Sequence, residues 1–243
     1  MTLRGSLSLL VIAMSSFLGA PLQGSVLVHV DFDSGYTTGP LAGQSGATDI
    51  GLSGSFLQGA TTGVARVVDA DPMAARDLGY DVADGSRIAG GSHSVEIGGA
   101  LGAVQDIFHR ALSSDITGRT LFMRVVLRPV TVVNAHTYLR FYLTSDAPAP
   151  NGLGGLNGAG FGLRDAGGSG PGANAMMNNA GMEYSADTSA GVLNAAPNLL
   201  VAKFHWNGTA YDRISIWVNP TATASAAPMA TQALPALTPS NLD

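Results

Sequence analysis

The residues with the chemistry to act on a ligand are few and lie far apart in this 243-residue chain. The chain has two glutamates, Glu96 and Glu183, and each stands alone, so the paired carboxylates of a glycosidase are missing. It has no cysteine, which excludes thiolate metal sites and cysteine nucleophiles. The stretches GLSGS and GGSHS do not match the G-x-S-x-G elbow of serine hydrolases, and no G-x-G-x-x-G follows a strand. The sequence therefore predicts a protein that is not an enzyme.

Aromatic and cationic residues at alternating positions are the best candidates for contacting a ligand. Sugar-binding surfaces stack aromatic rings on the apolar faces of sugars and add a few convergent polar groups. The predicted ligand-binding residues are Tyr138, Arg140, Tyr142, Lys203, His205 and Trp217. Alternating Tyr and Arg are also typical of ordinary cross-strand packing, and a tryptophan also fills the edge of a β-sandwich beneath a loop.

Two carboxylates near the start of the chain form the only predicted metal site. Asp31 and Asp33 share one side of an alternating stretch with His29, and carboxylates together with loop carbonyls are ligands for calcium. The alternative is a solvated strand face whose charges discourage edge pairing. No other cofactor is expected.

The bulk composition restricts the class of partner. The net charge is −5, and the 12 lysines and arginines are scattered singly along the chain. Because no basic stripe is visible, the sequence argues against a nucleic-acid partner. The 32 glycines and 12 prolines indicate many turns, which favours an all-β fold.

The first 24 residues have the pattern of a secretory signal peptide. Arg4 is followed by an apolar run to about Leu18 and then by small residues. The alternative is a retained anchor helix. The expected location is secreted, extracellular or at the cell surface, with no membrane span in the mature chain. The sequence does not determine the oligomeric state.

Short alternating stretches predict the strands that must position these residues. The opening stretch VLVHVDF, the stretch TLFMRVVL and the stretch TYLRFYL each place apolar residues on one side. Residues 63–68, 93–97 and 106–112 are shorter β-like runs. Within the glycine-rich residues 151–180, GFGLRD is interpreted as one strand between loops rather than part of a flexible excursion. Regular short strands separated by turns predict an antiparallel two-sheet β-sandwich.

The clearest hairpin spans residues 199–220. Its even positions are apolar on both sides of Asn207-Gly208. A two-residue turn there would pair even with odd residues and send the two apolar sets to opposite faces. The sequence therefore predicts an odd loop or a bulge near Tyr211-Asp212. Lys203, His205 and Trp217 then share the outer face with Arg213 and Ser215.

Two phrases resemble those of laminin G-like, concanavalin A-like jelly-roll domains of secreted bacterial proteins, often those with PEP-CTERM sorting signals. The opening phrase, F-D-x-x-Y-x-x-G-x-L-x-G-Q, is formed by Phe32, Asp33, Tyr36, Gly39, Leu41, Gly43 and Gln44. The closing phrase is formed by Val201, Ala202, Lys203, Trp206, Asp212, Ile214, Ile216, Trp217, Val218, Asn219 and Pro220. The resemblance implies one concanavalin A-like sandwich over residues 25–220.

The resemblance also implies a function, a non-catalytic module that binds carbohydrate or extracellular matrix polymer. The strand motifs of the glycosidases and polysaccharide lyases on this fold are absent. The alternatives are a polysaccharide-degrading enzyme using Tyr138, Arg140 and Tyr142, and a purely structural envelope protein. The final strand usual in such domains is missing, so the chain is expected to be truncated. Residues 221–243 are expected to be irregular, with an unpaired position beside the first strand and the strand of residues 213–218.

Overall fold

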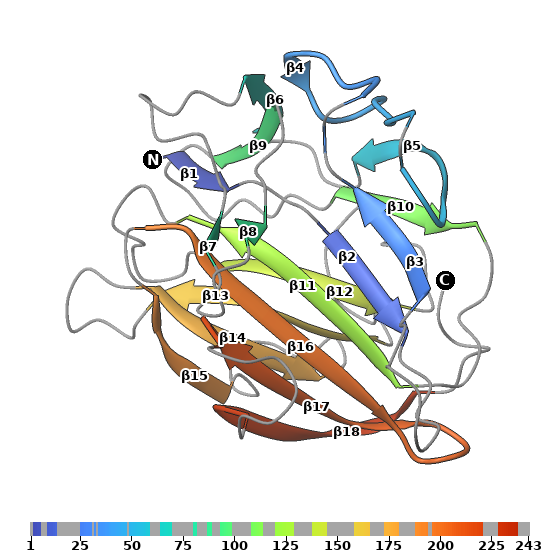
Figure 1. Cartoon of the computed structure of the whole chain (residues 1–243), viewed down its shortest axis with the longest axis vertical. Helices are drawn as coiled ribbons and strands as arrows, with labels where there is room; N and C mark the ends of the chain where they lie inside the picture. Colours follow the sequence, from blue (N-terminus) through green and yellow to red (C-terminus); the bar gives the residue numbers. More distant parts are fainter. Residues whose placement is uncertain are drawn as a thin grey trace.

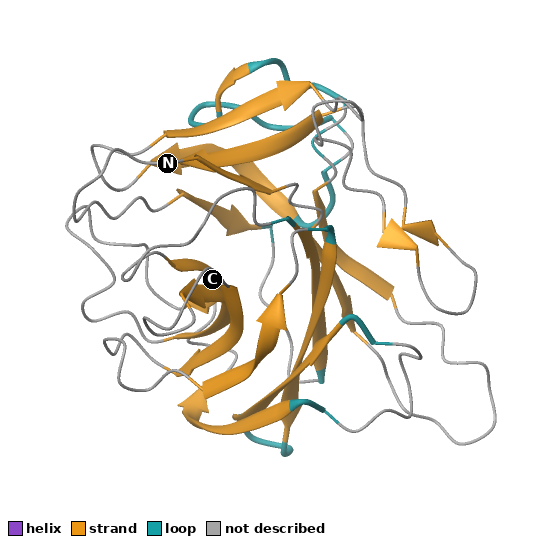
Figure 2. Ribbon diagram, turned by 90° about the vertical axis from the view of Figure 1, so that its left-hand side faces the viewer, coloured by secondary structure: helices purple, strands orange, loops and turns teal. Residues whose placement is uncertain are grey.

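The computed structural model describes residues 2–5, 9–13, 25–30, 32, 34–47, 49–58, 64–69, 80–81, 87–88, 93–98, 108–113, 120–128, 138–144, 158–165, 173–179, 188–193, 196–220 and 228–237. This part of the chain consists of strands and connecting turns (Figure 2). Every strand pairing within it is antiparallel. The all-β, antiparallel character predicted from the sequence is therefore confirmed.

A six-stranded sheet forms the largest element (Figure 1). Its spatial order is β18 (Ala230–Leu237), β17 (Tyr211–Val218), β16 (Asn198–Trp206), β11 (Leu121–Leu127), β2 (Leu9–Ala13) and β3 (Ser25–Val30). One face is apolar, as alternation predicts. The buried side chains of that face include Leu121, Met123, Val125, Leu200, Ala202, Phe204, Ile214 and Ile216.

A four-stranded sheet lies behind the six-stranded sheet in the view of Figure 1. It runs in the order β12 (Tyr138–Thr144), β13 (Gly158–Asp165), β14 (Ala173–Asn179) and β15 (Thr188–Leu193). The backbones of β14 and β15 come close to those of β17 and β18. The predicted strand in the glycine-rich segment is confirmed as β13, where Phe161 is fully buried against Phe141. β14 and β15 were not predicted, because alanine, asparagine and glycine hide their alternation.

Most of the remaining strands lie in the upper part of the molecule, and β7 and β8 lie lower, beside β11 (Figure 1). One sheet has the order β1 (Thr2–Gly5), β9 (His93–Gly98), β6 (Val64–Asp69) and β4 (Gly39–Pro40). The other pairs are β5 (Leu52–Gln58) with β10 (Phe108–Leu112), and β7 (Tyr80–Asp81) with β8 (Arg87–Ile88). Phe32, Tyr36, Phe56 and Val95 belong to the buried core of this end.

The tail expected to be irregular contains strand β18. It pairs with β17, and the Met229 amide donates to the Ile216 carbonyl oxygen at 2.9 Å. The position beside β17 that was expected to be unpaired is therefore occupied. The alternation of this strand is interrupted by Pro235. β18 is at the edge of the sheet and its register with β17 shifts across Pro235, and sheets tolerate proline at edges and bulges.

Two strands lie within the segment predicted to be a signal peptide. β2 pairs with β11 on one side and with β3 on the other, and β1 pairs with β9. In the described part of the chain, no helix is long and apolar enough to cross a bilayer.

The hairpin of β16 and β17 contains the predicted bulge. Phe204 pairs with Ile214 and His205 with Arg213, but Trp206 pairs with Tyr211, so Asp212 is the extra residue. The four-residue loop closes with a bond from the Asn207 amide to the Ala210 carbonyl oxygen at 3.0 Å. Because the bulge restores even-to-even pairing, both apolar sets point to the same side.

Candidate functional site

Three of the six predicted ligand-binding residues lie on one face of the six-stranded sheet, opposite the apolar face. Lys203 pairs with Ser215, His205 with Arg213, and Trp217 with Val201. Directly opposed residues share a face of the sheet. Lys203, His205 and Trp217 are therefore neighbours on adjacent strands, as the hairpin analysis predicted. This outer face, carrying Phe122, Arg124, Val201, Lys203, His205, Arg213, Ser215, Trp217 and Thr231, is called the β16–β17 face below.

A chain of hydrogen bonds crosses three strands on the β16–β17 face. His205 Nε2 lies 2.9 Å from Ser215 Oγ, which lies 2.9 Å from Thr231 Oγ1 of β18. On its other side, His205 Nδ1 accepts from Arg213 Nη2 at 3.3 Å. With Nδ1 accepting, Nε2 carries the proton and donates to Ser215. The network orients the imidazole between two strands.

The imidazole of His205 is held neutral. Partial burial, followed by the nearby charges of Lys203 and Arg213, lowers the pKa of His205 to about 4, against a smaller opposing effect of Asp212. A neutral imidazole accepts the Arg213 bond that an imidazolium would repel. At neutral pH, the positive charge of this face comes from lysine and arginine.

The cations of the β16–β17 face are interleaved with aromatic rings. Lys203 Nζ lies 5.6 Å from the centroid of the Phe122 ring, within cation–π range. Arg124 lies two residues after Phe122 on β11 and is on the same face of the sheet. Burial lowers the pKa of Arg124. Trp217 is half-buried. At one end of the face, Ile88 of β8 packs against Val126 and Leu199 together with Val201.

The His205–Ser215 pair is not arranged for nucleophilic catalysis. The side chain of a nucleophile must reach its substrate, and Ser215 is only 2% exposed. Its hydroxyl already bridges His205 and Thr231. The arrangement is suited to holding a rigid polar surface.

The other three predicted ligand residues lie in a different sheet. Tyr138, Arg140 and Tyr142 occupy alternate positions of β12, opposite Arg164, Gly162 and Gly160 of β13. They share one face of the four-stranded sheet and do not join the β16–β17 face. The predicted group of six is therefore divided into two groups of three.

The predicted calcium ligands Asp31 and Asp33 lie outside the described residues. Within the described ranges, no group of three or more His, Cys, Asp or Glu side chains is placed to hold a metal ion.

The opening phrase builds a closed loop between β3 and β5. The Gln44 side chain donates to the carbonyl oxygens of Thr37 and Pro40 and accepts from the Thr37 amide. The Leu41 amide donates to the Ala65 carbonyl oxygen at 2.9 Å. The Gly43 amide donates to the Phe56 carbonyl oxygen at 2.7 Å, and the Phe56 amide donates to the Gln44 carbonyl oxygen at 2.9 Å. Gly43 has φ +85°, a conformation that favours glycine. These residues of the phrase are explained by loop geometry.

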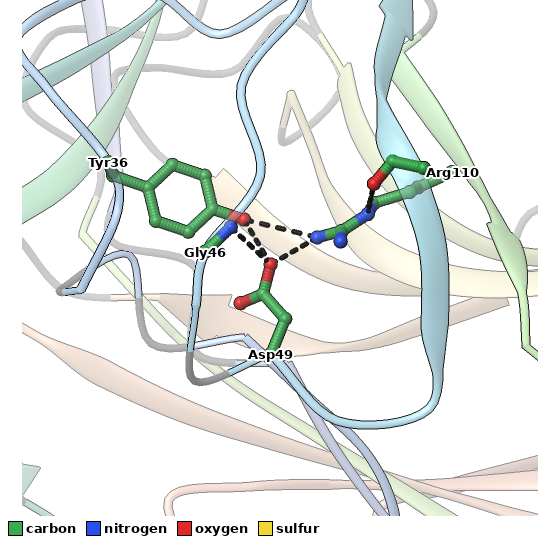
Figure 3. Close-up of polar contacts among 5 residues, drawn as sticks. Tyr36, Gly46, Asp49 and Arg110 are labelled. Carbon is green, nitrogen blue, oxygen red and sulfur yellow. Dashed lines mark hydrogen bonds and ion pairs between the residues drawn. The ribbon is translucent and has the colours of Figure 1, made fainter.

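A buried polar cluster fastens the same loop to β10 (Figure 3). Asp49 Oδ2 accepts from the Tyr36 hydroxyl at 2.7 Å, from the Gly46 amide at 2.7 Å and from Arg110 Nη1. The side chains of Asp49 and Arg110 are 1% and 6% exposed. Arg110 also donates from Nε to the Gly54 carbonyl oxygen and lies over the Phe56 ring. Burial, and then the hydrogen bond to Asp49, raise the pKa of Tyr36 above its ordinary value.

Sequence reasoning missed this cluster because Asp49 and Arg110 are separated by 61 residues. The second carboxylate oxygen, Asp49 Oδ1, is buried and has no hydrogen-bond partner among the described residues. A Cβ on Gly46 would lie 2.6 Å from it, so the loop backbone closes over that oxygen. The geometry makes the cluster a structural clamp between the loop and β10.

The closing phrase is explained in part by Asn219. This residue has φ +48°, and its side chain accepts from the Leu199 amide at 2.8 Å and donates to Asn198 Oδ1 at 3.0 Å. The Asn219 amide returns a bond to the Leu199 carbonyl oxygen. Asn-Pro therefore ends β17 and ties it to the start of β16.

Comparisons with known proteins identify no relative of this chain. A scan against protein-family models, a search of curated proteins and a search of solved structures all find no match to this chain.

Proposed function

We propose that this protein is an exported, non-catalytic module that binds carbohydrate through the β16–β17 face. The proposal includes the finer fold, a laminin G-like, concanavalin A-like β-sandwich that begins at residue 25 and continues past residue 220 to include β18, and removal of residues 1–24 on export. The observation that carries it is the position of Lys203, His205 and Trp217 on neighbouring strands of one face.

The chemistry of that face supports binding rather than reaction. Trp217 and Phe122 offer aromatic surface, while Lys203, Arg213 and Thr231 surround it with hydrogen-bond donors. Sugars require this combination of apolar stacking and fixed polar groups. The His205–Ser215–Thr231 network holds the surface in shape without an exposed nucleophile.

Retention on immobilised polysaccharides tests the proposal. The full chain is passed over a panel of neutral and acidic polysaccharides, and both retention and released sugar are measured. We expect retention without release. Trp217→Leu should weaken retention roughly threefold to tenfold, because it removes one aromatic contact.

Trp206→Leu is the matched control. Trp206 is in the same strand pair, but its ring packs edge-on against Tyr211 at 5.1 Å. This variant should alter the melting temperature but not the affinity of the folded protein. Sugar release that disappears in Tyr142→Phe would instead support a polysaccharide-degrading enzyme. Absence of retention on every polymer would support a purely structural protein.

A further inference from the structure

Three cations form a diagonal row across the β16–β17 face. Arg124 of β11 stands opposite Val201 of β16, and Lys203 lies two residues further along β16. Arg213 of β17 stands opposite His205, two residues beyond Lys203. Diagonal neighbours of this kind are roughly 7–8 Å apart, so the row is about 15 Å long. Residues that are scattered in the sequence are thus aligned by strand pairing.

The row carries positive charge in a chain whose net charge is −5. Among the described residues, no carboxylate forms an ion pair with Arg124, Lys203 or Arg213. Burial, and then the charges of Lys203 and Arg213, lower the pKa of His205, and the opposing effect of Asp212 is smaller. Within the described part of the chain, the row is therefore a run of three cations without a carboxylate partner.

Aromatic residues lie on both sides of the row. Phe122, at the level of Lys203 on β11, lies on one side, and Trp217, at the level of Arg124 on β17, lies on the other. A ligand along the row therefore meets a cation at each of three steps and an aromatic ring on each flank.

We propose that the ligand is an acidic, linear polysaccharide whose carboxylate or sulfate groups pair with Arg124, Lys203 and Arg213. This inference rests on the proposed function, since it names the class of carbohydrate bound at the same face. The polymer is inferred to be acidic because its charge would complement the three cations. It is inferred to be linear because the three cations lie in one row.

The observations favour a glycan over a nucleic acid. Proteins that bind nucleic acids through the backbone commonly use about 6–10 phosphate contacts, whereas this row supplies three cations. The net negative charge of the chain also opposes a long polyanion of high charge density. Single-stranded DNA is therefore one arm of the test.

The test measures the affinity of the full chain for four soluble polymers by affinity electrophoresis. The polymers are polygalacturonate, dextran sulfate, dextran and single-stranded DNA. We expect retardation by the two acidic glycans only, weakening as salt screens the charges. Lys203→Met and Arg213→Gln should each weaken binding roughly twofold to fivefold. The double variant should lose about tenfold, and Lys203→Arg should retain binding.

Arg66→Gln is the matched control, because it removes the same charge from an exposed position on β6 of another sheet. An equal loss in this variant would overturn the row as the binding site. Equal retardation by dextran would overturn the acidic ligand and leave the proposed carbohydrate function standing. Tighter binding of DNA would overturn the glycan in favour of a nucleic acid. If none of the four polymers retards the protein and no immobilised neutral polysaccharide retains it, the proposed function itself is overturned.

Discussion

At the scale of single residues, the Tyr36–Asp49–Arg110 cluster shows how one long-range ion pair organises a loop. Asp49 has three donors on one oxygen and almost no contact with water. A carboxylate buried to this extent is tolerated because a guanidinium is buried beside it. The cluster joins residues near both ends of the loop to β10 and so holds the opening phrase in place.

Arg110→Met should lower the free energy of unfolding by about 3 kcal/mol, because it leaves the buried Asp49 carboxylate without its cation. Methionine retains an apolar stem against Phe56. Urea unfolding monitored by circular dichroism measures the change. Adding Asp49→Asn to this variant should recover part of the loss, since the unpaired charge is then absent.

Arg66→Met serves as the control for Arg110→Met. Arg66 is exposed, and its replacement should change stability by less than about 0.5 kcal/mol. Similar losses for the two arginines would contradict the role given to the buried pair.

At the scale of elements, the β16–β17 hairpin is defined at both ends by local devices. The extra residue Asp212 sets which side chains face outward, and Asn219 terminates the pair. Without the bulge, Arg213 and Trp217 would turn toward the apolar side. The candidate binding surface is therefore a consequence of one inserted residue.

Asn219→Gly and Asn219→Ala separate the two contributions of Asn219. Glycine accepts φ +48° without strain but removes the bonds to Leu199 and Asn198, which should cost about 1–3 kcal/mol. Alanine removes the same bonds and adds roughly 1–2 kcal/mol for the left-handed conformation. Thermal melting measures the loss, and we expect the alanine variant to melt at a lower temperature than the glycine variant. If Asn219→Gly melts at the wild-type temperature, the side-chain bonds of Asn219 contribute nothing to stability. If the glycine and alanine variants melt at the same temperature, the left-handed conformation has no measurable cost.

At the scale of the whole molecule, the six-stranded sheet includes a strand from the predicted signal peptide. β2 separates β3 from β11, so its residues fill an internal position of the sheet rather than an edge. If residues 1–24 are cleaved on export, β2 is lost and β3 and β11 lose the strand between them. Strand edges without a neighbour present unpaired backbone groups.

Removal of residues 1–24 should therefore lower the melting temperature by several degrees. Hydrogen exchange should accelerate at alternate residues of β11, those whose amides face β2, while the amides shared by β16 and β17 stay protected. Unchanged exchange along β11 would show that another strand, such as β3, takes the place of β2.

The sequence alone determined the faces of the strands. Alternation identified the buried residues Leu121, Met123, Val125 and Leu127, and counting across the hairpin required the bulge found at Asp212. Both inferences use the two-residue period of a strand, which is a local property of the backbone. The placement of Lys203, His205 and Trp217 on one face followed from the same reasoning.

Only the tertiary structure decided which strands from distant parts of the chain are neighbours. The row of Arg124, Lys203 and Arg213 depends on β11 lying beside β16, and the clamp depends on Arg110 of β10 meeting a loop that begins at Phe32. The place of β18 beside β17, and the separation of Tyr138 from Trp217, depend on strand order in the same way. Pairing between distant strands depends on how completely the whole apolar face is buried. A short stretch of sequence does not specify this, because the contacts are between residues far apart in the chain.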